Sequence, residues 1–155
     1  LAKEKIAATV VNASISGDTT SGGRARLTAL LKQHRPQLVV IELGANDALR
    51  GLPLTMTQDN LAAMTKEVQK SGAKALLVGM QLPPNFGREY GQRFADVFAA
   101  VAKSHKAALV PFMLKGVADD ADSQRWFQAD RIHPREEAHP VILANIWPEI
   151  KKGLR

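Results

Sequence analysis

Four residues in this sequence carry groups that acyl-transfer chemistry uses beside its nucleophile. Asp130 and His133 stand three positions apart in a short segment closed by Pro134, so a carboxylate can hold an imidazole across one loop. An imidazole fixed on one nitrogen can act as a general base through the other. Gly17 offers a backbone N–H that no side chain obstructs, and Asn46 offers a side-chain amide. Two such donors beside a general base can stabilise an oxyanion while a hydroxyl attacks an acyl carbon.

Each of these motifs is a weak signal when taken alone. Asp-x-x-His and Gly-x-Asn-Asp sequences are ordinary turns in most proteins, since Gly, Asn and Asp all favour turns. The two motifs indicate an active site only if the fold brings them close together.

The central positioning element is the run Leu38–Leu43, which is apolar except for one residue and rich in β-branched side chains. A run of this kind is typical of a parallel strand buried on both faces. Gly44 then turns the chain and places Asn46 and Asp47 just beyond the strand. Ligands of open α/β sheets bind outside this carboxyl edge, so we expect a site there and a structural role for Asp47 in holding the turn.

The rest of the chain alternates between strand and helix patterns. We expect further strands at Thr9–Ile15, Lys74–Met80 and Ala108–Phe112. Apolar stripes with helical spacing predict helices around residues 27–34, 61–68, 90–101 and 141–150. Thr55 and Gln58 have the spacing of a capping box for the second helix, and Pro148 should bend or end the last. The pattern predicts one α/β domain over residues 1–155, with a parallel sheet and right-handed crossovers.

Composition narrows the function classes. The chain has a net charge of +6, but its cations are spread along the sequence and its aromatic residues are few, so we expect no nucleic-acid partner. Arg24, Arg26 and Lys32 on one predicted helix keep a functional basic patch open as the lesser alternative to a solvated surface. There is no cysteine, no cluster with metal-ligand spacing and no apolar run of about 20 residues, so we expect no metal and no stable membrane insertion.

Three segments together resemble the SGNH (GDSL) hydrolases, closest to their bacterial arylesterase and thioesterase/lysophospholipase branch. Asn12–Thr19, Glu42–Asp47 and Asp130–Pro134 are similar to the second, third and fifth sequence blocks of that family. The segment Leu82–Gly87 is similar to the mobile substrate loop of the branch, with Leu82, Pro83 and Phe86 as the candidate substrate contacts. The resemblance runs in order over nearly the whole chain.

The resemblance implies a function and a fold. Gly17 N–H and the Asn46 amide would be the oxyanion donors, His133 the general base and Asp130 the residue that orients it. The fold would be a flavodoxin-like three-layer α/β/α domain. Its activity would be hydrolysis of acyl esters and thioesters without cofactor or metal, after export to the periplasm or beyond.

The family's nucleophile block has no counterpart in the sequence. The family begins with a strand that runs into Gly-Asp-Ser-Leu, and this strand is central, between the counterparts of Thr9–Ile15 and Leu38–Leu43. We therefore expect the chain to be an N-terminally incomplete domain, inactive alone, that a separate segment completes. Thr19 in Gly17-Asp18-Thr19 mimics the nucleophile motif, yet its flanks match the second block, so Thr19 and Ser16 are expected to make turn hydrogen bonds.

Two other function classes stay open at this point. One is a non-catalytic flavodoxin-like module that binds a small ligand or a partner at the same strand ends. The other is an assembly role in which the gap in the sheet accepts a strand from another chain. Trp126 and Phe127, just before Asp130, favour core packing over an acyl groove.

Overall fold

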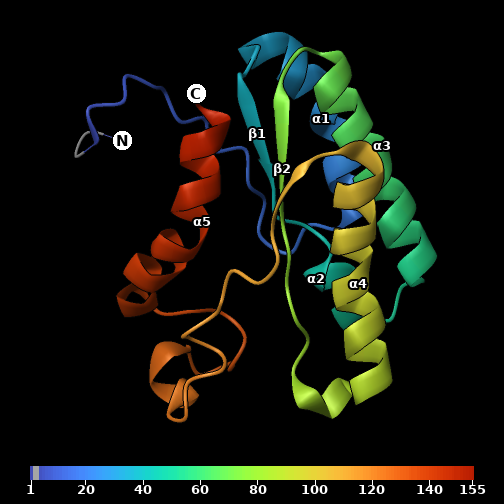
Figure 1. Cartoon of the computed structure of the whole chain (residues 1–155). Coiled ribbons are helices and arrows are strands. Elements are labelled where there is room, and N and C mark those ends of the chain that lie inside the picture. Colours follow the sequence, from blue (N-terminus) through green and yellow to red (C-terminus); the bar gives the residue numbers. More distant parts are fainter. Residues whose placement is uncertain (2–3) are drawn as a thin grey trace.

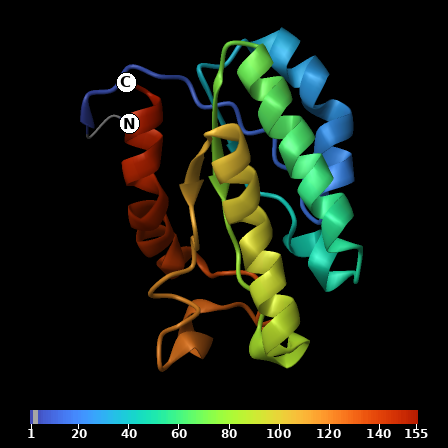
Figure 2. The same ribbon diagram turned by 45° about the vertical axis from the view of Figure 1, so that its right-hand side comes forward.

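The structure is a computed structural model that describes Leu1 and residues 4–155, and it has three layers (Figure 1). The middle layer is a parallel sheet of β1 (Leu38–Ile41), β2 (Lys74–Val78) and β3 (Ala108–Val110), in the order β1-β2-β3. One face carries α1 (Thr20–His34), α3 (Leu54–Lys70) and α4 (Arg88–His105), and the other carries α5 (His139–Gly153) (Figures 1 and 2). The predicted α/β/α class with a parallel sheet is confirmed.

Four short helical segments complete the described elements. They are α2 (Ala45–Leu49) and the 3-10 helices η2 (Pro84–Phe86), η3 (Ser123–Trp126) and η4 (Glu136–Ala138). The polar turn predicted after Leu43 is in fact the start of α2, because Gly44 adopts φ 120° and lets the chain reverse directly into a helical turn.

The main core lies between the sheet and the three helices α1, α3 and α4. The predicted apolar stripes supply it, with Leu27 from α1, Leu61 from α3 and Phe94 from α4 all buried. Phe94 and Phe98 meet edge to face with ring centroids 5.3 Å apart. These contacts fix the strand ends on which the candidate site depends.

The packing under α5 is much less complete. Ile146 and Ile150 contact Leu76, Val78 and Val110 of the sheet, yet no residue of α5 is fully buried. Leu143 of α5 is 53% exposed and Val40 of β1 is 43% exposed. Apolar surface therefore stays open on this face, beside the outer strand β1. The helix continues through Pro148 to Gly153, so the proline does not end it.

The prediction of a strand at Thr9–Ile15 is wrong. This segment is irregular and pairs with no strand of the described chain, and its residue Val10 is 75% exposed. A strand forms only where a neighbour accepts and donates its backbone hydrogen bonds, and β1 has its one described partner in β2. The described sheet therefore has three strands instead of four.

The capping box predicted for the second helix is also wrong. The helix α3 begins at Leu54, one residue after Pro53, and no side chain caps it. Pro53 is itself the N-cap, with φ −58° and an extended ψ of 128°, and the helix starts at the next residue, so Thr55 and Gln58 both lie inside the helix.

Candidate active site

The structure places the side chains of Asp130 and His133 in contact. His133 Nδ1 and Asp130 Oδ2 are 2.7 Å apart. The other carboxylate oxygen, Oδ1, accepts the backbone N–H groups of Ile132 at 2.9 Å and His133 at 3.0 Å. The His133 side chain is 63% exposed, so its second ring nitrogen can be reached from solvent. A carboxylate on Nδ1 and an accessible Nε2 are what a general base needs.

A small hairpin holds this pair in place. Phe127 and Pro134 form an antiparallel bridge, and Gln128 N–H donates to the carbonyl of His133 at 2.8 Å. Arg131 turns the tip with φ 58°. The loop predicted around Asp130 is therefore more ordered than an exposed turn, because cross-strand hydrogen bonds close it at its base.

The pKa of the Asp130 carboxyl is lowered to about 2, mainly by the hydrogen bond from His133 and then by the two backbone N–H groups. A lowered pKa means that the ionised carboxylate stabilises the hairpin above its ordinary pKa of 3.8, and that this contribution is lost as the pH falls through about 2. We predict that a ¹³C carboxyl titration finds a midpoint for Asp130 near 2, and that His133→Ala moves it toward 3.8. Asp120 is the matched control, since its pKa is also lowered to about 2 but by Trp126, Asp122 and Arg125. Equal midpoints for Asp130 with and without the imidazole would contradict the pairing.

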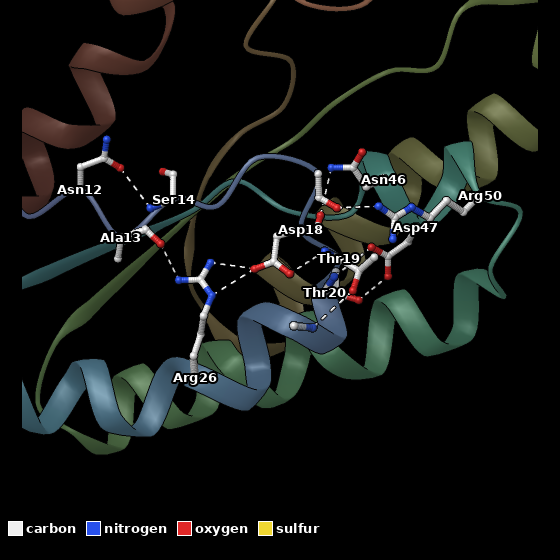
Figure 3. A network of polar contacts seen from close by, with 12 residues as sticks. Asn12, Ala13, Ser14, Asp18, Thr19, Thr20, Arg26, Asn46, Asp47 and Arg50 are labelled. Carbon is white, nitrogen blue, oxygen red and sulfur yellow. Dashed lines mark hydrogen bonds and ion pairs between the residues drawn. The ribbon is translucent and has the colours of Figure 1, made fainter.

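The second part of the site is the turn at Gly17, and Figure 3 shows the polar contacts around the next residue, Asp18. Gly17 adopts φ 76°, a conformation that side chains rarely tolerate. Asn46 Nδ2 donates to the carbonyl of Asp18 at 3.0 Å, and the Arg50 guanidinium donates to the carbonyl of Gly17 at 2.8 Å. Both donors come from α2 or its end, so the structure brings the two predicted oxyanion residues, Gly17 and Asn46, together.

An ion pair braces the same turn from the other side. Arg26 contacts Asp18 Oδ2 through Nε at 3.0 Å and through a terminal nitrogen at 2.9 Å, and it also donates to the carbonyl of Ala13 (Figure 3). Arg26 is thus not a free member of a basic patch. Sequence reasoning missed this pair, because a separation of eight positions matches no local helix or turn spacing.

Asp47 lies at the centre of a buried polar network. It is fully buried and accepts the backbone N–H of Thr20 at 2.9 Å, the Thr20 hydroxyl, and the Thr57 hydroxyl at 3.3 Å. Asn60 Nδ2 donates to the Thr20 hydroxyl at 3.1 Å. The network joins α2 to the beginning of α1 and to α3, which agrees with the structural role predicted for Asp47.

The two hydroxyls that mimic a nucleophile behave differently. Thr19 is the N-cap of α1 and its Oγ1 accepts the N–H of Gly22 at 3.3 Å, which confirms the expected turn hydrogen bond. Ser16 is exposed, and within the described residues its side chain makes no hydrogen bond, so that half of the expectation is wrong. The hydrogen bond in this turn is made by the next residue, Gly17, whose carbonyl accepts from Arg50.

Three segments around the site leave the sheet at one edge. The α2 segment, the loop that includes η2, and the segment after β3 all follow carboxyl strand ends, at the lower end of the sheet in Figure 1. Within the described residues no hydrogen bond joins the Asp130–His133 pair to the Gly17–Asn46 pair. Two hollows of about 410 and 440 Å³ lie at the opposite edge, where Lys74 lines both, and are therefore separate from this site.

The predicted substrate loop and the aromatic residues have mixed surroundings. Leu82 is half-buried against the main core, Pro83 is exposed, and Phe86 is half-buried within η2. Trp126 and Phe127 pack on the cluster of Leu114, Val117 and Ala138, as expected of core residues. In the part of the chain that the structure describes, no three acidic or histidine side chains gather as metal ligands, and no helix is long and apolar enough to cross a bilayer.

Comparisons with known proteins agree with this arrangement. Residues 1–141 match the model of the GDSL-like lipase/acylhydrolase family. The chain is 54% identical to the esterase TesA of Pseudomonas aeruginosa over 142 residues, which are 92% of this chain and 69% of TesA. It is 44% identical to the thioesterase 1/protease 1/lysophospholipase L1 of Escherichia coli K12, over 86% of this chain and 62% of that protein.

A solved structure gives the same result for the fold. The psychrotrophic esterase EstA of Pseudoalteromonas superposes with a TM-score of 0.90 and 38% identity, over 99% of this chain and 82% of that one. With a family match over most of its length and these relatives, the chain belongs to the GDSL-like lipase/acylhydrolase family, the SGNH hydrolases.

Proposed function

We propose that the protein hydrolyses carboxylic esters and thioesters of acyl groups with a serine nucleophile that a segment outside residues 1–155 supplies. The observation that carries this proposal is the 2.7 Å contact of His133 Nδ1 with Asp130. In the same structure, the turn at Gly17 lies against Asn46, whose amide bonds the Asp18 carbonyl. This chain together with the proposed serine segment is called the full-length protein.

His133 acts as the general base in this proposal. Asp130 holds the Nδ1–H tautomer, so Nε2 takes the proton of the serine hydroxyl as the serine oxygen attacks the acyl carbon. The imidazolium then gives this proton to the leaving alcohol or thiol, and an acyl-serine remains. Water, deprotonated by the same nitrogen, then attacks the acyl carbon. The bond to the serine oxygen breaks, the imidazolium returns its proton to that oxygen, and the acid is released.

Gly17 and Asn46 stabilise the oxyanion of each tetrahedral intermediate. The Asn46 amide has two N–H groups, and one is committed to the Asp18 carbonyl at 3.0 Å. This bond orients the amide and leaves its second N–H for the substrate oxygen. Donors that are fixed before the reaction contribute most to stabilising the developing charge.

The open edge of β1 supports the proposal that a separate strand supplies the serine. The backbone groups of β1 on the side away from β2 have no strand partner among the described residues, and its Val40 is 43% exposed. A parallel strand beside β1 would cover that exposed surface and end at the same edge as Gly44. If this strand takes the place of the family's first strand, as the resemblance implies, its serine would lie at this carboxyl end. Without that segment we expect this chain to be inactive.

The names of the relatives support acyl substrates. They are called an esterase, a thioesterase and lysophospholipase, and a further esterase whose solved form is inhibited by monoethylphosphonate. Tetrahedral phosphonates resemble the intermediate of acyl transfer, as an oxyanion site requires. Leu82, Pro83 and Phe86 are the proposed acyl-chain contacts. The family resemblance favours the periplasm or the exterior as the place of action.

The second candidate function is a non-catalytic ligand-binding module. Such a module would bind its ligand at the same carboxyl edge of the sheet without forming a covalent bond. Hydrolysis of p-nitrophenyl butyrate separates the two. The esterase proposal expects turnover by the full-length protein, and the binding module expects none.

We predict that Asn46→Ala lowers kcat of the full-length protein by about 100- to 1,000-fold with little change in KM, because one oxyanion donor is lost. The measurement is steady-state hydrolysis of p-nitrophenyl butyrate. Asn12→Ala is the matched control, since Asn12 makes an exposed contact with the Ser14 backbone and should keep full activity. A loss of less than about tenfold in Asn46→Ala would argue against its role as an oxyanion donor.

A further inference from the structure

We propose that Asp120 is a positioning residue for His133, because it anchors the hairpin that carries the general base through the side chain of Trp126. This proposal rests on the proposed function for the role of His133, but the anchor itself is a separate physical claim.

Asp120 gathers three donors although it lies in an irregular loop. Its Oδ2 accepts Trp126 Nε1–H and the Arg125 guanidinium, both at 2.8 Å, and its Oδ1 accepts the Asp122 N–H at 2.9 Å. The Arg125 guanidinium also stacks 4.6 Å from the centre of the Trp126 ring. The carboxylate is therefore held by the residues at the two ends of the η3 segment, and these bonds keep its pKa lowered to about 2.

Trp126 is the residue at which the hairpin begins. Its carbonyl accepts the Arg135 N–H at 2.7 Å, and the next residue, Phe127, bridges to Pro134. The Arg135 Nε–H adds a bond to the Phe127 carbonyl at 2.7 Å. His133 stands two positions before Arg135, so the orientation of Trp126 sets the direction in which the whole hairpin projects.

The hairpin has few other polar attachments. Among the described residues, every hydrogen bond of residues 127–135 is made within residues 124–138. Asp120 therefore links the loop before η3 to the base of the hairpin through Trp126 and through the neighbouring Arg125, beside the packing of Trp126 on Leu114 and Val117. Because misplacement of a reacting group by about 1 Å can cost about 100-fold in rate, this anchor bears on catalysis.

The experiment compares Asp120→Ala with Asp120→Asn in the full-length protein. Alanine removes every acceptor, whereas asparagine keeps one carbonyl oxygen for the indole N–H. We expect Asp120→Ala to lower kcat by about tenfold to 100-fold with KM within about twofold, and Asp120→Asn to restore activity to within about threefold of wild type. Asp122→Asn is the matched control, since it makes the same change of charge in the same loop and its side chain makes no described hydrogen bond. Rates are divided by the concentration of serine labelled to completion with a fluorophosphonate, so loss of folded protein does not count as loss of rate.

A second readout does not depend on activity. Trp147→Phe leaves Trp126 as the one tryptophan of residues 1–155, and its indole N–H resonance reports the bond to Asp120 directly. In that background we expect Asp120→Ala to move this resonance and to speed amide exchange of Gln128 and Arg135 at least about tenfold. Unchanged exchange of those two amides, or a kcat equal to that of Asp122→Asn, would overturn the proposal. Absence of turnover in the wild type with the exchange effect intact would instead refute the proposed function and leave Asp120 as a purely structural anchor.

Discussion

Replacing His133 with glutamine should lower kcat/KM of the full-length protein for p-nitrophenyl butyrate by about 10,000-fold or more. Glutamine is close in size and keeps polar atoms, but it cannot take and return the proton of a serine hydroxyl. Loss of one member of a nucleophile, base and acid set costs about this much in serine hydrolases, and the losses do not add.

His139 supplies the control for this substitution. It begins α5 six positions after His133 and is exposed, and no part of the proposed chemistry uses it. His139→Gln should retain activity within about twofold. Near-normal turnover by His133→Gln, with the labelled serine still present, would remove His133 from the reaction.

Replacing Asp47 with alanine should lower the free energy of unfolding by about 3 kcal/mol or more. The substitution leaves three buried donors without an acceptor, namely the backbone N–H and hydroxyl of Thr20 and the hydroxyl of Thr57. Each buried polar group that loses its partner costs about 1–3 kcal/mol. Urea unfolding monitored by circular dichroism gives the difference.

Asp59→Ala is the matched control for stability, since Asp59 lies exposed on α3. Its effect should stay within about 0.5 kcal/mol. A change of less than about 1 kcal/mol in Asp47→Ala would mean that water or a rearranged neighbour replaces the carboxylate, and the buried network would not hold α1, α2 and α3 together.

Features that depend on local spacing were predictable from the sequence. The strands that begin at Leu38 and Lys74, and the helices that carry Leu27 and Phe94, follow from runs and stripes of apolar residues. The contact of Asp130 with His133 also follows, because three positions and a short loop suffice to close it.

Features that depend on distant partners were not predictable. The segment Thr9–Ile15 has the composition of a strand, but its conformation depends on a neighbour that the described sheet lacks. The bonds of Asp47 to Thr20 span 27 positions, and no local pattern encodes them. The bond from Trp126 to Asp120 spans only six positions, yet it depends on how an irregular loop folds back on itself.

Asn46 belongs between these two groups. Its place after a central strand was predictable, whereas its bond to the carbonyl of Asp18 requires that the Gly17 turn reach the same edge. That convergence belongs to the fold, and at the level of sequence only the resemblance to the SGNH hydrolases indicates it.

The measurement that tests the account most directly is fluorophosphonate labelling followed by peptide mapping by mass spectrometry. The reagent is applied to this chain alone and to the full-length protein, under the same conditions. We predict that the full-length protein is labelled on one serine outside residues 1–155, and that this chain alone stays unlabelled. A label on Ser16, Thr19 or any other residue of this chain, or no label on the full-length protein, would contradict the proposal that the site borrows its nucleophile from a further segment.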